Sequence, residues 1–191
     1  MKNNLLGFVF FILAFSSTLF SYDEYMDGVY AYKEKDYKKS FTYFQQAANK
    51  GNGEAYFYIG VQYQFGYGVQ QNIDEAIISY KKGAELNDYL SMASLGILYK
   101  DTETLRDYKK AAYWYEKSIQ SDKYDVNSRI ALGLIYYDGG YGVTQNKIKS
   151  YKYWKECASL DESKVLVVSL ISSCQNNLDI LCKESPWACQ K

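Results

Sequence analysis

The sequence contains no histidine among its 191 residues. This absence excludes Ser-His-Asp and Cys-His nucleophilic systems, and it excludes zinc sites that depend on imidazole ligands. Proline is almost absent as well, since Pro186 is the single proline of the chain. A chain with so little proline can form many helices without interruption, which favours an all-helical fold.

An excess of charge of either sign is also missing. Lys and Arg together number 22, as do Asp and Glu, so the net charge is zero. Proteins that bind nucleic acid neutralise phosphates with a basic surface, and nothing in this composition indicates one. Tyrosine, in contrast, is abundant, with 22 residues. Its ring fills a core while its hydroxyl stays at the edge, which suits thin, two-layer architectures.

The first 21 residues have the order of a bacterial Sec-type signal peptide. Lys2 gives a positive start, residues 5–15 are apolar, and a polar segment of small residues continues to Ser21. The apolar stretch is too short to span a hydrocarbon core of roughly 30 Å, although an uncleaved membrane anchor is the alternative interpretation. We expect cleavage near Ser21, no stable membrane insertion of the mature chain, and a periplasmic or secreted protein.

Four similar segments recur along the rest of the chain. Each begins with an Asp or Asn, residues that cap helices by accepting hydrogen bonds from free backbone N–H groups. Small and aromatic residues follow at intervals of four, which places them on one helix face. The caps are Asp36, Asn72, Asp107 and Asn146, separated by 36, 35 and 39 residues. This period is that of a helix pair.

A second helix is predicted before each of the last three caps, and each of these helices contains Gly-x-x-Tyr. The glycines are Gly60, Gly96 and Gly133, and Gly28 is a candidate for the same position in the first repeat. A glycine inside a helix costs about 1 kcal/mol relative to alanine. Its recurrence therefore predicts a close approach of the partner helix, where no Cβ fits. A fifth helix of this kind is expected from Ser163, where it would end the stack.

Three further motifs point to a known repeat. They are GYGV at 66–69 and 140–143, LGILY at 95–99, and KAAYWYEKSI at 110–119. Together they resemble the Sel1-like repeat, a relative of the tetratricopeptide repeat. The resemblance implies an all-α fold, an α-solenoid of antiparallel helix pairs with a concave face for partners. We expect a signal peptide (1–21), a tetratricopeptide-like first repeat (22–53), three Sel1-like repeats (54–90, 91–127 and 128–162) and a cysteine-containing cap (163–191).

The four cysteines, Cys157, Cys174, Cys182 and Cys189, all lie in the last 35 residues. An even number in an exported chain favours disulfides, and a zinc site of four thiolates is the alternative. We expect the pairs Cys174–Cys182 and Cys157–Cys189, and no bound metal or cofactor. The spacing of Cys174 and Cys182 resembles that of the staples in the Helicobacter cysteine-rich proteins, which are exported Sel1-like proteins, so the chain is similar to a sparse relative of that group.

A binding scaffold is the function that the repeats favour. Their regular positions are used for packing, which leaves the variable helix faces free for a protein partner or a cell-wall component. The predicted contacts are residues of the first helices that would face the concave side: Tyr56, Gln62, Gln64 and Tyr137.

An enzyme is the alternative, because the resemblance to the cysteine-rich group implies β-lactamase or penicillin-binding activity. Serine β-lactamases use a Ser-x-x-Lys motif, and Ser79 with Lys82 matches it. No Ser-Asp-Asn or Lys-Thr-Gly motif follows, however. We therefore expect a scaffold rather than a catalyst.

Overall fold

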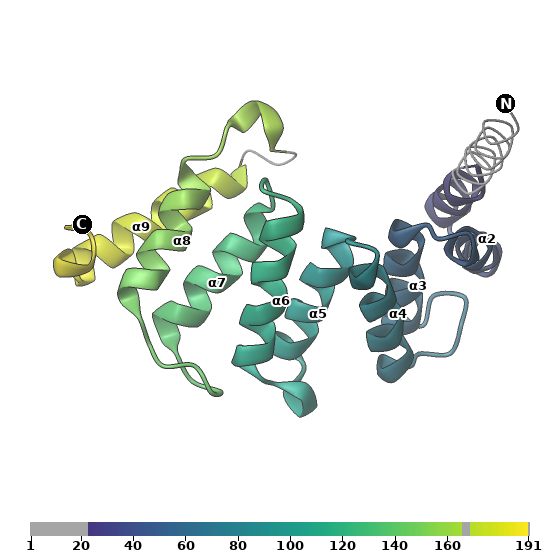
Figure 1. Ribbon diagram of the computed structural model, residues 1–191, viewed down its shortest axis with the longest axis horizontal. Coiled ribbons are helices and arrows are strands. Elements are labelled where there is room, and N and C mark those ends of the chain that lie inside the picture. The colour runs from purple at the N-terminus through teal and green to yellow at the C-terminus, as the bar shows by residue number, and fades with distance from the viewer. Residues whose placement is uncertain (1–22, 166–168, 191) are drawn as a thin grey trace, which may run out of the picture. The chain divides into compact units, whose positions relative to one another are not determined.

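The computed structural model describes residues 23–165 and 169–190, so the predicted signal peptide lies outside the described residues. These residues form helices joined by turns and contain no strand (Figure 1). The predicted all-α fold is confirmed. The chain divides into two compact units, Met1–Ser91 (unit 1) and Met92–Lys191 (unit 2).

Each unit is built from antiparallel helices that follow one another along the chain (Figure 1). Unit 1 contains a helical segment at 23–33, then α2 (Tyr37–Asn49), α3 (Gly53–Phe65), α4 (Ile73–Glu85) and the start of α5 (Tyr89–Asp101). Unit 2 contains the rest of α5, then α6 (Tyr108–Ser121), α7 (Val126–Asp138), α8 (Lys147–Ala158) and α9 (Ser169–Glu184), with the short 3-10 turns η1 (Glu103–Leu105), η2 (Glu162–Lys164) and η3 (Pro186–Ala188).

The predicted cap residues begin the second helix of each pair. Their side chains accept a hydrogen bond from the backbone N–H three residues later, at donor–acceptor distances between 3.0 and 3.2 Å. Each bond satisfies one of the N–H groups that the first helical turn leaves without a partner. The caps are Asp36 for α2, Asn72 for α4, Asp107 for α6 and Asn146 for α8.

The first helices of the last three pairs, α3, α5 and α7, are capped in the same way, by residues that were not predicted. Asn52, Asp88 and Asp125 accept bonds of 3.0, 2.8 and 3.0 Å from the N–H three positions on. Asp88 and Asp125 are buried. The Asp125 carboxylate also accepts a 2.5 Å bond from the Ser118 hydroxyl of α6, so this cap links the two adjacent helices α6 and α7.

The helical glycines lie where the partner helix approaches most closely. A Cβ on Gly96 would lie 2.6 Å from the Tyr115 ring, and one on Gly28 would lie 2.7 Å from the Phe44 ring. Real Cβ atoms do not occur at such distances, so the predicted close approach is confirmed. The recurring pairs are Gly28 with Phe44, Gly60 with Tyr80, Gly96 with Tyr115 and Gly133 with Trp154.

The loops inside the pairs differ in sequence but close with one hydrogen bond. In the last three pairs, the N–H of the cap residue donates to the carbonyl of the tyrosine in Gly-x-x-Tyr, at 2.7–2.9 Å, and in the first pair Asp36 donates to the Ala31 carbonyl at 2.9 Å. The third repeat has no glycine in this loop and uses the 3-10 turn η1 instead. The bonds run from Asn72 to Tyr63, from Asp107 to Tyr99 and from Asn146 to Tyr136.

In the two GYGV loops, the tyrosine contacts the repeat that precedes it. Tyr67 stacks on Tyr37 of α2 with ring centroids 4.8 Å apart, and Tyr141 packs on Tyr108 of α6 at 4.9 Å. The loop glycine Gly68 has a φ of +73°, and a Cβ there would lie 2.5 Å from the backbone of Tyr37. These loops therefore need glycine both for conformation and for contact.

The predicted fifth helix begins later than Ser163. The Ser163 N–H and hydroxyl both donate to the Asp161 carboxylate, at 3.0 and 2.8 Å, which closes the turn η2 rather than starting a long helix. The helix that follows is α9, from Ser169 to Glu184, and it packs against α8. After it, η3 folds back onto α8 and ends the described chain.

Candidate binding cleft at the C-terminal cap

Gln62, a predicted ligand contact, is buried in unit 1 and has no exposed surface. Its side-chain amide donates to the carbonyls of Tyr37, at 2.7 Å, and Tyr67, at 3.2 Å. The residue thus holds the GYGV loop against the preceding repeat. The prediction of Gln62 as a partner contact is therefore wrong. The sequence pattern indicated the helix, but it did not indicate that the GYGV loop covers the helix face that contains Gln62.

Two other predicted contacts in unit 1 are half-buried. The Gln64 side-chain oxygen accepts a 2.7 Å bond from the Tyr80 hydroxyl, and its carbonyl accepts a 2.8 Å bond from Gln71. Tyr56 packs beside the core around Phe44. A role for Gln64 or Tyr56 in binding stays a prediction.

Ser79 and Lys82, the candidate catalytic pair, have separate partners. The Ser79 hydroxyl is buried and donates a 2.8 Å bond to the Glu75 carbonyl one turn earlier in α4. The Lys82 ammonium is exposed and lies 5.8 Å from the centre of the Tyr56 ring. A nucleophilic serine needs a base within hydrogen-bond reach, and this arrangement does not supply one.

The cysteines pair differently from the prediction. The structure has disulfides Cys157–Cys174, with Cα atoms 6.0 Å apart, and Cys182–Cys189, at 5.7 Å. Cys174 and Cys182 cannot pair because both lie on α9, where eight residues span about 12 Å. A disulfide requires Cα atoms within about 7 Å. The sequence showed the spacing but not that one helix contains both residues.

Tyr137, the remaining predicted contact, lies near the end of α7 among groups from three other segments. Its hydroxyl donates to the Glu184 carboxylate, and this hydrogen bond raises the tyrosine pKa. The Lys147 ammonium lies 5.2 Å from the centre of its ring, and the Gln145 side chain donates a 2.7 Å bond to its carbonyl. Tyr137 therefore forms one flank of the region where α8 begins and α9 ends.

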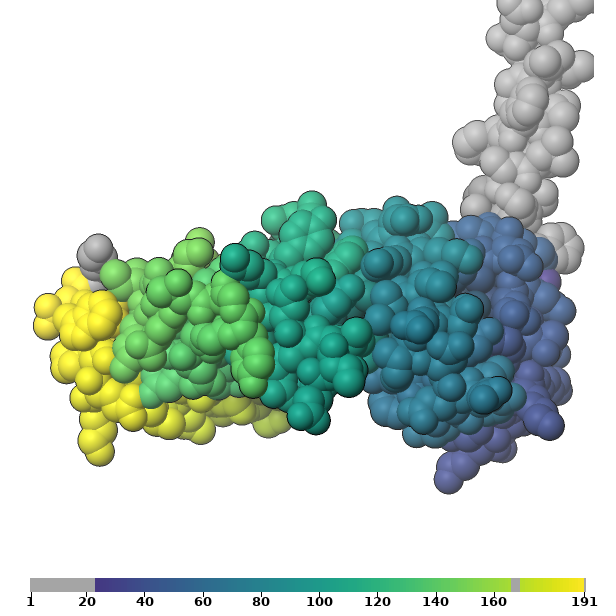
Figure 2. Space-filling view, turned by 90° about the horizontal axis from the view of Figure 1, so that it is seen from below, coloured from purple at the N-terminus to yellow at the C-terminus, as the bar shows by residue number. Residues whose placement is uncertain are grey.

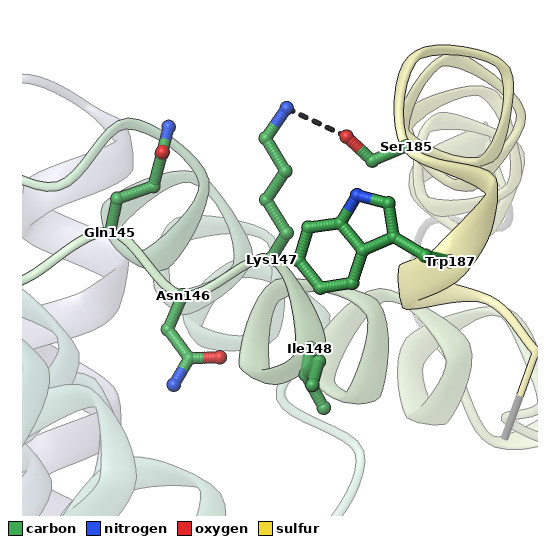
Figure 3. Close-up of a pocket in the computed structure, with 6 residues that line it drawn as sticks. All are labelled: Gln145, Asn146, Lys147, Ile148, Ser185 and Trp187. Carbon is green, nitrogen blue, oxygen red and sulfur yellow. Dashed lines mark hydrogen bonds between the residues drawn. The ribbon is translucent and has the colours of Figure 1, made fainter.

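At this place the surface has a cleft of about 430 Å³ (Figure 3). Its floor and walls come from the start of α8 and from the segment around η3. The Lys147 ammonium donates a 2.9 Å bond to the Ser185 hydroxyl across the cleft. The Trp187 indole stands beside the Lys147 side chain and is 59% exposed (Figure 3). The lining residues are Gln145, Asn146, Lys147, Ile148, Ser185 and Trp187.

A second hollow of the same size continues from the cleft along α8 and shares Ile148 with it. It is lined by Ile148, Tyr151, Lys152, Lys155, Glu156, Ser159 and Ala188. We call the two together the cap groove. Figure 2 shows the C-terminal residues, in yellow, packed beside the green part of unit 2 to which α8 belongs.

Trp187 and Ile148 were not predicted as site residues, although both are large, apolar and exposed in the structure. One signal was available for Trp187. It follows Pro186 in the short segment between Cys182 and Cys189. A disulfide-closed loop this short has little room to bury an indole, but this argument needs the Cys182–Cys189 pairing, which was not the one expected from the sequence. No comparable signal marks Ile148.

The helix pairs that recur along the described residues define a helical repeat protein. The chain belongs to the Sel1 repeat family. The model of this repeat matches residues 21–52, 53–88, 90–122 and 127–161.

Two curated proteins are similar over part of the chain. DAP3-binding cell death enhancer 1 of Rattus norvegicus is 30% identical over 86 residues, which is 45% of this chain and 15% of that protein. Chitin synthase regulatory factor 3 of Schizosaccharomyces pombe is 25% identical over 135 residues, which is 69% of this chain and 14% of that protein. The chain thus spans a small part of both relatives.

Two solved structures share the fold. One is a protective antigen of uropathogenic Escherichia coli strains that displays an SLR fold, with a TM-score of 0.70 at 20% identity, covering 86% of this chain and 34% of the antigen. The other is a Sel1 repeat protein from Oxalobacter formigenes, with a TM-score of 0.64 at 24% identity, covering 84% of this chain and 72% of that protein. Both support the α-solenoid class predicted from the sequence.

Two general features of the described residues bear on the site. None of the helices in residues 23–165 and 169–190 is long and apolar enough to cross a membrane. Within the same residues, no three His, Cys, Asp or Glu side chains are grouped so that they could hold a metal ion. The disulfides also occupy all four cysteine sulfurs, so the zinc site considered as an alternative has no thiolates.

Proposed function

We propose that this protein is an exported scaffold that binds a protein partner, or a component of the cell envelope, through the cap groove. The observation that carries the proposal is the exposed indole of Trp187 at the wall of a cleft whose other residues are mostly polar. Partly exposed tryptophans in hollows are frequent anchors at protein interfaces. A protein partner agrees with the name of one relative, which describes it as binding DAP3.

The residues that recur in every repeat are not available to bind a partner, because they pack inside the protein. The glycines and aromatic residues that recur in every repeat are used against each other inside the helix pairs. Gln62 is used in the same way, to hold a loop. What differs from repeat to repeat is the surface, and in unit 2 the groove lies at its C-terminal end.

Export is supported by two features at opposite ends of the chain. Residues 1–21 have the pattern of a signal peptide. The two disulfides lie at the C-terminal end, and disulfides persist in oxidising compartments outside the cytosol. Fractionation of the native cells, with mass spectrometry of the protein's N-terminus, is expected to find a mature chain that starts near residue 22 outside the cytosol.

Binding is tested in the same cells by photocrosslinking. A photoreactive aromatic amino acid replaces Trp187 in one variant and Tyr113 in the other. Tyr113 is a matched control because it is 53% exposed in unit 2 but is not a groove residue. A discrete adduct from position 187 that is missing from position 113 is expected. Adducts of equal yield from both positions, or none from position 187, would contradict the proposal.

A further inference from the structure

We propose that the cap groove binds an extended acidic peptide segment and seats one apolar side chain of this peptide between Trp187 and Ile148. This inference rests on the proposed function and names the chemistry of the ligand. It is carried by the length of the groove, its charge and its exposed apolar side chains.

The length of the groove fits a peptide in extended form. On α8 its lining runs from Ile148 through Tyr151, Lys152 and Lys155, and Ser159 follows directly after the helix. These spacings of three and four place the side chains on one helix face. The eleven steps from Ile148 to Ser159 correspond to about 16 Å at 1.5 Å per residue. An extended chain covers that distance with about five residues.

The charge of the groove favours an acidic ligand. Its ionisable lining consists of three lysines, Lys147, Lys152 and Lys155, and one glutamate, Glu156, which leaves an excess of two positive charges. The chain as a whole is neutral, with 22 residues of each sign. Glu156 already faces a lysine, since its carboxylate lies 3.9 Å from the Lys152 ammonium. Lys147 and Lys155 have no acidic partner among the ion pairs of the described residues, so carboxylates of the ligand can pair with a lysine at both ends of the groove.

The apolar side chains give the groove an anchor point. Trp187 is 59% exposed and Ile148 is 41% exposed, although both are large and apolar. In Figure 3 the indole nitrogen lies on the same side as the Lys147 ammonium, and the ring lies beside the lysine stem. A ligand can thus place an apolar side chain against the ring while a neighbouring carboxylate reaches Lys147. Covering an exposed indole removes apolar surface from water, which favours binding.

The segment that presents Trp187 is held in place before any ligand arrives. The Cys182–Cys189 disulfide ties the turn η3 to the end of α9. Ser185 is buried, and its N–H donates a 2.7 Å bond to the Leu181 carbonyl. A backbone segment that is already held in place loses little conformational freedom on binding, which improves affinity.

Two other classes of ligand would use lysines and a tryptophan, namely an anionic oligosaccharide and an anionic membrane surface. An anionic oligosaccharide carries no apolar side chain that could cover Ile148, which is 41% exposed. A flat bilayer would contact the rims of a hollow rather than its floor. The groove therefore favours a peptide, and both alternatives are included as arms of the test.

The test uses the oxidised mature chain and a short fluorescein-labelled peptide in which glutamates flank a central leucine. Binding is followed by fluorescence anisotropy, and a blue shift of tryptophan emission reports the covering of Trp187. Charge reversal in Lys152→Glu/Lys155→Glu is expected to weaken binding by about tenfold or more, and Trp187→Ala by a similar factor. Lys81→Glu/Lys117→Glu is the control, since both lysines are exposed and lie outside the groove. It is expected to leave the affinity within about twofold.

Peptides and alternative ligands decide between the classes. A peptide with lysines in place of the glutamates, and one with serine in place of leucine, are expected to bind at least about tenfold more weakly. If an oligouronate or phosphatidylglycerol vesicles bind through the groove while the acidic peptide does not, the peptide proposal is overturned. Absence of binding by all probes overturns it too. A crosslinked partner at position 187 would still support the proposed function in that case, so the two failures can be told apart.

Discussion

The indole of Trp154 lies so close to the backbone of Gly133 that a methyl group on this glycine would overlap the indole nitrogen. The same pairing recurs in each repeat, with phenylalanine, tyrosine or tryptophan as the aromatic residue. It explains why a residue that weakens helices is kept in the middle of α7: the space of the missing side chain is filled by a ring that is almost fully buried. The glycine and the ring therefore act as one packing unit.

Gly96→Ala tests this unit in α5. Helix propensity alone would make alanine more stable by about 1 kcal/mol. Because the new Cβ would lie 2.6 Å from Tyr115, we expect instead a loss of about 2 kcal/mol in the free energy of unfolding. Urea denaturation followed by circular dichroism measures it. In a Tyr115→Leu background the same substitution should cost clearly less, and a neutral or stabilising effect in the native background would contradict the packing argument.

Gln62→Leu tests the link between the GYGV loop and the preceding repeat. The substitution leaves the carbonyls of Tyr37 and Tyr67 without their buried donor, so we expect a loss of about 1–3 kcal/mol in the free energy of unfolding. Hydrogen exchange in residues 66–71 should accelerate. Gln70→Leu is the control because Gln70 is exposed in the same loop. Equal exchange rates in the two variants would show that Gln62 does not hold the loop.

The repeat architecture could be predicted from the sequence because local rules agree with one another. Each residue type of the pattern has one position in a helix pair: Asn146 caps a helix, Gly133 lies at the close approach and Trp154 fills the space there. These positions recur with the period of the repeat. The loop of the third repeat could not be predicted, because η1 replaces the glycines with a 3-10 turn of ordinary residues. Its closing hydrogen bond is nevertheless the same.

The site was harder to predict than the fold, because it depends on where the segment around η3 packs against α8. Tyr137 was expected to be a contact; it lies beside Gln145 and Lys147 of the cleft lining, and its role in binding stays a prediction. Lys147 and Trp187 are 40 residues apart in sequence and meet only through the turn η3. The predicted cysteine pairing was wrong for a related reason: the sequence did not indicate that one helix, α9, contains both Cys174 and Cys182.

The pairing of the disulfides gives a distinct peptide pattern after trypsin digestion without reduction. Cleavage after Lys155, Lys164 and Lys183 separates Cys157, the Cys174–Cys182 stretch and Cys189 into three peptides. The disulfides of the structure join all three into one species. The pairing first expected from the sequence would instead give a middle peptide with an internal bond and a joined outer pair.

The same bonds have unequal consequences for stability. Cys157 and Cys174 are buried and close a loop with a sequence separation of 17, so Cys157→Ala/Cys174→Ala is expected to cost about 3 kcal/mol. Cys182–Cys189 closes a shorter loop, with a separation of 7, and its removal should cost less while it mobilises Trp187. Thermal unfolding of the two double variants measures the order. The reverse order would contradict the assignment of Cys157–Cys174 as the main stabilising bond.

The cap of α6 is expected to give the protein a pH dependence that one substitution removes. The Lys110 backbone N–H holds the pKa of Asp107 below its ordinary value. A carboxyl whose pKa is lower in the folded state stabilises the fold above its unfolded pKa, near 3.9, and loses this contribution as the pH falls through the folded pKa. Asp107→Ala should cost about 1 kcal/mol at neutral pH.

Asp107→Asn separates charge from capping, because asparagine still offers an oxygen to the Lys110 N–H but does not titrate. The advantage of the native chain over this variant should therefore shrink as the pH falls from about 5 to about 2, across the titration range of a carboxyl with a lowered pKa. Urea denaturation of both proteins over this range measures it. Since Asn146 caps α8 in the native chain with the same 3.0 Å geometry, an amide is structurally acceptable at such a cap. A stability difference that does not change with pH would mean that the charge of Asp107 contributes nothing to the cap.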